Sequence, residues 1–147
     1  MPQSESRSES ISALVNEVFL ASAALARAGD RLATPQGLTA ARWLVLGALQ
    51  DGPISISEIG RRRGLSRQSS RESIERLERA GLVVRAENPR DRRAPLLHLT
   101  RAGEEALATI EPRRAAWAAR LARDLDGERV DAATRLLREL RELLAEG

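Results

Sequence analysis

The sequence predicts a mostly α-helical fold with one small β-hairpin, and three observations support that prediction. Apolar residues recur at helical spacing over residues 10–32 and again over residues 126–144. Between residues 55 and 81, two short segments follow each other closely, and each begins after a serine and ends at a glycine, as capped helices do. Two β-type runs, residues 82–87 and 95–99, then flank an arginine-rich loop.

The N-terminal part is expected to form two helices after a disordered start. Residues 1–9 are rich in serine, glutamate and arginine and are predicted to be disordered. The helical pattern over residues 10–32 is broken by the Thr-Pro-Gln-Gly sequence at residues 34–37. Thr39 is placed to cap the next helix, which ends at the Asp-Gly-Pro sequence of residues 51–53.

Two short helices are predicted next. Ser55 and Glu58 fit a capping box, in which the hydroxyl and the carboxylate each accept from an otherwise unpaired backbone amide. This helix ends at Gly64, and Ser66 caps the following helix, which ends at a left-handed Gly81. The inner face of the second helix is formed by Ser70, Ser73, Ile74, Leu77 and Ala80.

The C-terminal part is predicted to contain the hairpin and two further helices. Pro95 suits either the start of the second strand or an edge position, because it cannot donate to a strand ladder. Thr100 is placed to cap a long helix that reaches about Leu125 and that Pro112 should kink. Asp126 caps the last helix, whose apolar stripe contains Val130, Ala133, Leu137, Leu140 and Leu144.

In this order the elements form a winged helix-turn-helix over residues 38–100, within a single domain that covers residues 10–147. Residues 10–33 and 101–147 supply the additional helices. A helix-turn-helix followed by a basic hairpin is typical of proteins that bind duplex DNA.

The distribution of charge agrees with a polyanionic partner. All 24 basic residues are arginine, so every cation can form a planar bidentate fork. Residues 54–101 contain 12 arginines and 6 acidic residues, a net charge of +6, whereas the rest of the chain has a net charge of −3.

The composition argues against several other classes of protein. The chain has no cysteine, which excludes disulfides and thiolate chemistry, and its one histidine, His98, makes a metal site improbable. His98 is expected to be structural or a weak phosphate contact. Because no clustered carboxylates and no glycine-rich phosphate loop are present, we expect no catalysis, no cofactor and no metal.

The N-terminus lacks the apolar core of a signal peptide, and no run approaches about 18 apolar residues. We therefore expect a soluble, cytoplasmic chain that has no membrane partner.

The second helix of the helix-turn-helix is expected to enter the major groove with its N-terminal half. Gln68 and Arg71 are placed to contact base edges. Glu72 either accepts from cytosine or pairs with Arg76 one turn on, and we favour the pair. The residues placed for phosphate contact are Ser66, Arg67, Ser69, Arg76 and at least one of Arg61, Arg62 and Arg63, although a solvated basic face is the simpler interpretation for each of these last three.

The hairpin loop, residues 88–94, is the second group of candidate DNA contacts. Its candidates are Asn88, Arg90, Arg92 and Arg93, since a narrow minor groove attracts arginine. Asp91 is expected to accept from a neighbouring arginine and to hold the loop in shape. A mobile, solvated hairpin tip is the alternative for the free protein.

The chain resembles the MarR family of transcriptional regulators, and the resemblance covers nearly all of it. It rests on Ile59–Gln68, Leu77–Val83, Asn88–Ala94 and Leu99–Gly103, which occur in the family's order and spacing. The resemblance implies an obligate homodimer on a pseudo-palindromic operator, usually a repressor relieved by a small ligand. It also implies that Arg93 is the minor-groove residue and Asp91 its structural partner.

The chain departs from the family pattern at three positions. Arg63 stands where an apolar residue is more usual, and Ser70 and Ser73 replace aliphatic residues on the inner face of the recognition helix. Each serine gives up roughly 1–2 kcal/mol of apolar burial. Their hydroxyls are expected to bond back to helical carbonyls.

The terminal helices have apolar faces that a module of some fifty residues cannot bury, so we predict that they cover each other and a second copy of the chain. The expected interface residues are Leu14, Val18, Trp117, Leu121, Val130, Leu137, Leu140 and Leu144.

The resemblance also implies an effector site between the dimer helices and the winged module, for an aromatic or anionic ligand. Candidate lining residues are Asn16, Phe19, Arg42, Trp43, Arg113 and Arg114. The simpler interpretation, which we favour, places Phe19 and Trp43 in the core and leaves Arg113 and Arg114 at the surface.

The sequence thus predicts a sequence-specific, homodimeric DNA-binding regulator, most readily a repressor. The alternative is a winged-helix module that contacts an acidic protein. The basic hairpin together with a capped recognition helix favours DNA.

Overall fold

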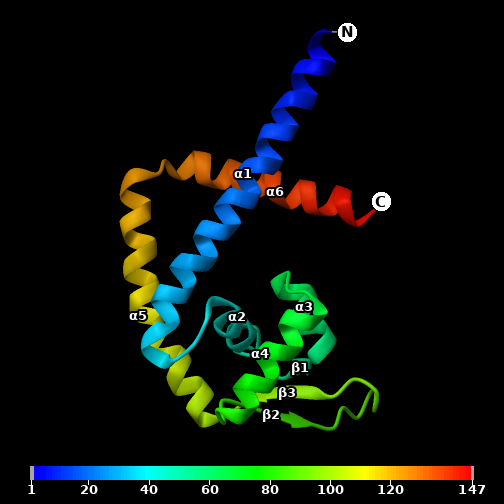
Figure 1. Ribbon diagram of the computed structural model, residues 1–147, viewed down its shortest axis with the longest axis vertical. Helices are drawn as coiled ribbons and strands as arrows, with labels where there is room; N and C mark the ends of the chain where they lie inside the picture. Colours follow the sequence, from blue (N-terminus) through cyan, green and yellow to red (C-terminus); the bar gives the residue numbers. More distant parts are fainter. Residues whose placement is uncertain (1, 147) are drawn as a thin grey trace. The chain divides into compact units, whose positions relative to one another are not determined.

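The structure is a computed structural model that describes residues 2–146 and contains helices and one small sheet, as the sequence predicted (Figure 1). The chain divides into two units, residues 1–110 and residues 111–147. In order, the elements are α1 (Pro2–Ala33), η1 (Thr34–Gln36), α2 (Ala40–Ala48), β1 (Ile54–Ser55), α3 (Ile56–Arg63), α4 (Arg67–Arg79), β2 (Val83–Ala86), β3 (Leu96–Leu99), α5 (Arg101–Asp124) and α6 (Gly127–Ala145).

Helix α1 begins at Pro2, so the prediction of disorder for residues 1–9 is wrong for residues 2–9; Met1 lies outside the described residues. The hydroxyls of Ser10 and Ser12 each donate to the carbonyl oxygen four residues earlier, at 3.0 Å. The apolar periodicity starts only at residue 11, so it could not reveal a helical turn that rests on local hydrogen bonds alone.

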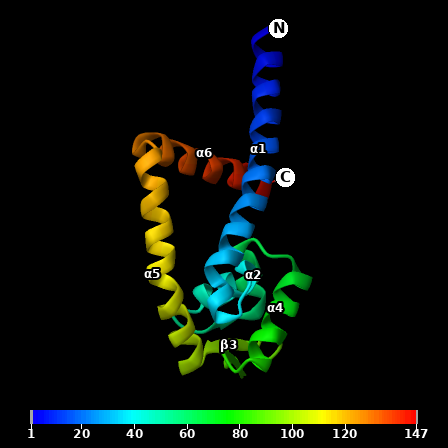
Figure 2. The same cartoon turned by 60° about the vertical axis from the view of Figure 1, so that its left-hand side comes forward.

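The C-terminal end of α1 is held against α2, as both views show (Figure 2). The carboxylate of Asp30 accepts from the backbone amide of Ala40 at 2.7 Å. A Cβ on Gly29 would lie 2.8 Å from the Cβ of Ala40, so only glycine allows this approach. The predicted break at residues 34–37 is confirmed, and Thr39 caps α2 by accepting from the amide of Arg42.

The core of the first unit lies between α2, α3, α4 and the sheet. Its fully buried side chains include Val45, Leu46, Ile59, Ile74, Leu77, Leu97 and Ile110. The predicted inner face of α4 is confirmed for its first four members. Ala80 is exposed, because it is the C-cap residue and follows the last helical turn that packs on the core.

The sheet has three antiparallel strands in the order β1-β3-β2, and the sequence predicted only the last two. Strand β1 has two residues, with Ile54 paired to Leu97 and Ser55 to Leu96. A strand of this length has no alternating pattern, and only its tertiary pairing with β3 defines it. We call the hairpin of β2, β3 and the loop between them, residues 83–99, the wing. The wing is therefore attached to the start of α3 as well as to the end of α4.

Helix α5 starts where the wing ends. The hydroxyl of Thr100 accepts from the amide of Gly103 at 3.1 Å and donates to the carbonyl oxygen of Gly81 at 2.6 Å. A Cβ on Gly103 would meet the backbone carbonyl of Leu82, so glycine is required there. Helix α5 is continuous through Pro112, and the kink expected there stays a prediction.

Helix α6 is capped by Asp126, as predicted, and none of its described residues is buried by its own chain. Helix α1 also exposes apolar surface. The region Glu5–Gln36 contains an 18-residue window of mean hydropathy 1.4, of which 6% is buried. By length and composition, α1 is therefore long and apolar enough to cross a membrane. It contains no uninterrupted run of about 18 apolar residues, as expected from the sequence.

Candidate nucleic-acid interface

The helix-turn-helix is built by local capping bonds that the sequence predicted. The hydroxyl of Ser55 accepts from the amide of Glu58 at 3.4 Å, and that of Ser66 accepts from the amide of Ser69 at 3.0 Å. Gly64 ends α3 with φ of +64°. These bonds fix where α4 begins and leave its N-terminal side chains at the surface.

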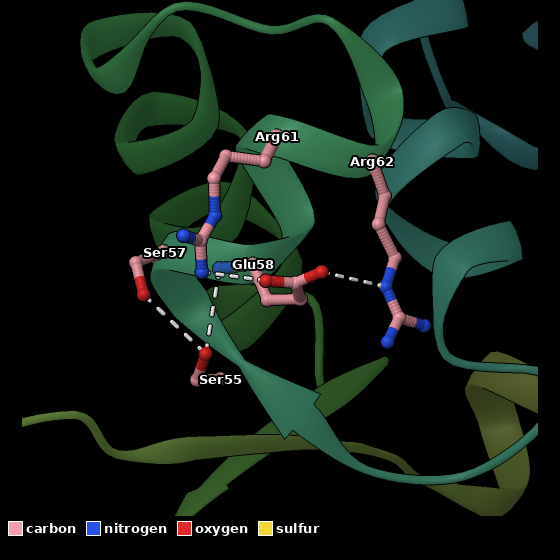
Figure 3. A network of polar contacts seen from close by, with 5 residues as sticks. All are labelled: Ser55, Ser57, Glu58, Arg61 and Arg62. Atoms are coloured by element: carbon pink, nitrogen blue, oxygen red, sulfur yellow. Dashed lines mark hydrogen bonds and ion pairs between the residues drawn. The ribbon is translucent and has the colours of Figure 1, made fainter.

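One carboxylate on α3 holds two of the three arginines of that helix (Figure 3). Glu58 accepts from Nη2 of Arg61 at 2.5 Å and from Nε of Arg62 at 3.0 Å. The hydrogen bond from Arg62 and the charge of Arg61 hold the pKa of Glu58 below its ordinary value. Only the hydroxyl half of the predicted capping box is seen, since the carboxylate points toward the arginines.

Arg63 is separated from the other two arginines. A Cβ added to Gly47 of α2 would lie 3.3 Å from its guanidinium, so the side chain of Arg63 extends over α2. The long aliphatic stem of arginine can cover apolar surface in the place of the apolar residue that is more usual there. Of the three arginines expected to act together on α3, only Arg61 and Arg62 share a partner, Glu58. The guanidinium of Arg63 lies near Gly47 of α2.

On α4, each candidate for base contact is bonded to a glutamate one turn on. Nε2 of Gln68 donates to Glu72, and Nε of Arg71 donates to Glu75, both at 3.1 Å. The predicted pair of Glu72 with Arg76 is therefore wrong. Gln68 and Arg76 both lie four residues from Glu72, so spacing alone could not choose between them.

The wing loop is shaped by two side chains that bond to its own backbone. Asn88 donates to the carbonyl oxygen of Ala94 at 2.9 Å and accepts from the amide of Arg90 at 3.0 Å. Asp91 accepts from the amide of Arg93 at 2.9 Å. The partner of Asp91 is thus a backbone amide and not the guanidinium expected from the sequence. Asn88, predicted only as a DNA contact, also organises the loop.

A cavity of about 600 Å³ places the three parts of this interface on one surface. Arg61 of α3, Arg71 of α4 and Arg93 of the wing all line it. Arg85 of β2 also lines it and is bonded to Glu78 at 2.7 Å. Arg85 was not among the predicted site residues, although an arginine within a predicted strand next to the basic loop was a usable signal.

Ser70 lies on the inner side of α4 in this cavity lining, with 4% of its surface exposed. A Cβ on Gly60 would lie 3.1 Å from its hydroxyl oxygen, so α3 and α4 approach closely here. This hydroxyl has no hydrogen-bond partner among the described residues, which contradicts the expected bond to a helical carbonyl.

The candidate DNA contacts are accessible. Ser69 and Asn88 are half-buried, and the remaining candidates are exposed: Arg61, Arg62, Ser66, Arg67, Gln68, Arg71, Arg76, Arg90, Arg92 and Arg93.

The candidate effector residues do not share one environment. Trp43 is half-buried and packs on the core, as favoured, whereas Phe19 is 72% exposed, so its predicted core position is wrong. This part of α1 extends past the core that its own chain provides. Arg42 bonds to Thr39, and Arg114 forms an ion pair with Glu111 at 2.6 Å. Asn16 and Arg113 have exposed side chains.

The candidate interface residues of the terminal helices are not buried by their own chain. Leu14, Val18, Trp117 and Leu140 are half-buried, and Leu121, Val130, Leu137 and Leu144 are exposed. Leu144 is the most open of these, at 72%.

Comparisons with known proteins agree with this geometry. A model of the MarR family matches residues 36–94, which contain the helix-turn-helix and the wing. The chain is 33% identical over 133 residues to the uncharacterized protein Rv2011c of Mycobacterium tuberculosis, covering 90% of this chain and 93% of the relative.

Two solved structures are similar over most of their length. Sco5413, a MarR family transcriptional regulator from Streptomyces coelicolor, is 28% identical with a TM-score of 0.77, covering 91% of this chain and 94% of its own. A mutant of MarR from E. coli, complexed with operator DNA, is 22% identical with a TM-score of 0.77, covering 88% and 94%, and it shows the shared fold. The chain belongs to the MarR family of winged helix-turn-helix proteins and is a DNA-binding transcriptional regulator.

Proposed function

We propose that the chain acts in the cytoplasm as a homodimeric repressor that binds a pseudo-palindromic operator and is released by a small aromatic or anionic ligand. One observation carries the DNA part of this proposal. Arginines from α3, α4 and the wing line one continuous surface, at the exposed start of a capped helix. Guanidinium groups on such a surface suit both phosphates and guanine edges.

Each part of the surface has a role in this proposal. Gln68 and Arg71, near the N-terminus of α4, contact base edges in the major groove. The wing enters the minor groove, and its backbone needs little rearrangement because Asn88 and Asp91 already hold the loop. The proposed phosphate contacts are Arg61, Arg62, Ser66, Arg67, Ser69 and Arg76.

The exposed apolar surface supports a dimer. Removing apolar area from water stabilises by about 25 cal/mol per Å². Val130, Leu137 and Leu144 of α6 remain 38–72% exposed in the single chain. A second copy that covers these residues and the apolar part of α1 accounts for the high hydropathy of α1 without a membrane. A twofold dimer also presents two recognition helices, which fits two half-sites about one helical turn apart.

The proposed effector site uses Trp43 and Arg42 of α2. Trp43, which is half-buried against the core, and the guanidinium of Arg42 provide an aromatic face and a cation within the first unit. The complementary ligand is an aromatic carboxylate, which would shift the dimer away from the DNA-binding state by binding the other state more tightly. Repression follows where the operator overlaps a promoter.

A fluorescence anisotropy titration tests the DNA part. The protein is titrated into a labelled duplex that it selects from a random library, at several salt concentrations. We expect log K to fall linearly with log salt, by about 0.9 per phosphate neutralised, and sedimentation to show a dimer on the duplex. Equal affinity for selected and shuffled duplexes, or binding only to acidic proteins, would contradict the proposal.

A further inference from the structure

The recognition helix and the wing differ in how their cations are paired. On α4, Gln68 and Arg71 each donate at 3.1 Å to a glutamate that lies four residues later on the same exposed face. In the wing, within the residues that the structure describes, the guanidinium groups of Arg90, Arg92 and Arg93 make no hydrogen bond or ion pair. The side chains proposed to read bases are therefore paired, whereas the cations of the wing are open to phosphate.

The paired glutamates face the same solvent-filled hollow as the side chains that they hold. Arg67, Gln68, Arg71, Glu72 and Glu75 line one surface hollow of about 540 Å³ along α4. The side chain of Arg71 is 79% exposed and that of Glu75 is 43% exposed. A duplex lying on this face brings its phosphates within a Debye length of both carboxylates, so their repulsion is not fully screened.

The charges on this surface favour binding to a matched duplex, which carries the bases that Gln68 and Arg71 contact, over binding to an unmatched one. Helix α4 carries four arginines and three glutamates between Arg67 and Arg79, so by itself it attracts a phosphate backbone weakly. An exposed pair at this spacing favours the paired state only about twofold. A bidentate contact with the correct base favours binding by roughly 5- to 150-fold, so a matched base easily replaces the glutamate.

We infer that Glu72 and Glu75 determine specificity, because they withhold Gln68 and Arg71 from the phosphate backbone and release them only to matched base edges. On an unmatched duplex no base contact compensates for the lost pair and for the carboxylates left near phosphate. This inference rests on the proposed DNA-binding surface. It proposes that these two acidic residues lower the affinity of the protein for unmatched duplexes.

The test compares three variants that each remove one negative charge. Glu75→Gln and Glu72→Gln remove the proposed specificity residues. Glu105→Gln is the matched control, because the pair of Arg101 with Glu105 on α5 has the same spacing and the same 3.1 Å length. Each variant is titrated into the duplex selected by the wild type and into a shuffled duplex of the same composition, at several salt concentrations.

We expect Glu75→Gln and Glu72→Gln to bind the shuffled duplex roughly 3- to 10-fold more tightly, with a smaller gain on the selected duplex and a salt dependence steeper by about 0.9 per phosphate gained. Glu105→Gln should leave the ratio of the two affinities unchanged. Equal gains on both duplexes, an equal effect of Glu105→Gln, or weaker binding to both duplexes would overturn the inference.

A second measurement removes the cation instead of the acid. In an Arg71→Ala background, Glu75→Gln should change the ratio of affinities no more than Glu105→Gln does, because the restrained guanidinium is gone. A further loss of specificity in that background overturns the inference. Failure of the wild type to bind any duplex is a different outcome, since it overturns the proposed function itself.

Discussion

The buried hydroxyl of Ser70 predicts that Ser70→Ala makes the protein more stable. The residue is 4% exposed, and its hydroxyl oxygen has no hydrogen-bond partner among the described residues. A buried polar group without a partner costs about 1–3 kcal/mol, and alanine removes that group without leaving a large cavity. Alanine also removes the oxygen that Gly60 closely faces.

A control variant, Ser73→Ala, separates the stability gained by removing the unpaired hydroxyl from the stability gained because helices favour alanine. Ser73, one turn later on α4, is 6% exposed, and its hydroxyl is not among the buried atoms without a partner. Both serine-to-alanine changes gain roughly 0.5 kcal/mol of helix propensity. We expect Ser70→Ala to exceed Ser73→Ala by about 1 kcal/mol, or roughly 2–4 °C in Tm for a protein of this size.

Calorimetric unfolding of the two variants and the wild type checks this prediction at one protein concentration, since a dimer makes Tm depend on concentration. A Ser70→Ala protein that melts below the wild type, or below Ser73→Ala, would refute the reasoning. That result would mean that the hydroxyl of Ser70 has a stabilising partner in solution.

Three further predictions concern the wing, the dimer and pH. Arg93→Ala should lower the salt dependence of DNA binding by about 0.9 in slope and change the free energy of unfolding by less than about 0.5 kcal/mol, because an exposed loop residue makes few core contacts; equal losses in Tm and in affinity would count against a direct contact. Leu140→Asp should place an unpaired charge in the proposed interface and weaken association on the order of 100-fold, measured by sedimentation equilibrium; a full dimer at low concentration would show that α6 is not in the interface. Because Arg62 and Arg61 lower the pKa of Glu58 from its ordinary 4.5, its carboxylate stabilises the folded state above that value and loses this effect as the pH falls through the lowered pKa. Glu58→Gln should therefore lose slightly less stability than the wild type between neutral and acid pH. Denaturant unfolding at each pH measures this difference. An unchanged pH dependence would show that the contacts of Glu58 with Arg61 and Arg62 do not stabilise the fold.

The parts of the fold that depend on local chemistry were predictable from sequence. Thr39, Ser66 and Asp126 each cap the helix that the sequence assigned to them, because an N-cap is decided by the residues of a single turn. The glycine positions that end α3 and α4 were predictable for the same reason, since Gly64 and Gly81 both have positive φ.

The remaining features depend on tertiary contacts, which the spacing of residues in the sequence does not determine. Strand β1 exists only through its pairing with β3, and Glu72 had two equivalent partners at four residues' distance. Phe19 fits a helical stripe, yet its stripe extends beyond the core of its own chain. Periodicity identifies an apolar face, but it does not say whether the same chain or another copy covers that face.

The central claim, that α4 and the wing contact duplex DNA, can be tested by placing a cleavage reagent on each element. The chain has no cysteine, so a single introduced cysteine reacts alone. Gln68→Cys on α4, Arg92→Cys in the wing and Leu144→Cys on α6 are each coupled to an iron chelate that generates hydroxyl radicals, and each is bound to the selected duplex.

We predict strand cleavage near the centre of each half-site from the position on α4, and cleavage in the flanking minor groove from the wing position. The position on α6 should give no cleavage above background. Saturating binding with no localised cleavage from either the α4 or the wing position would contradict the claim.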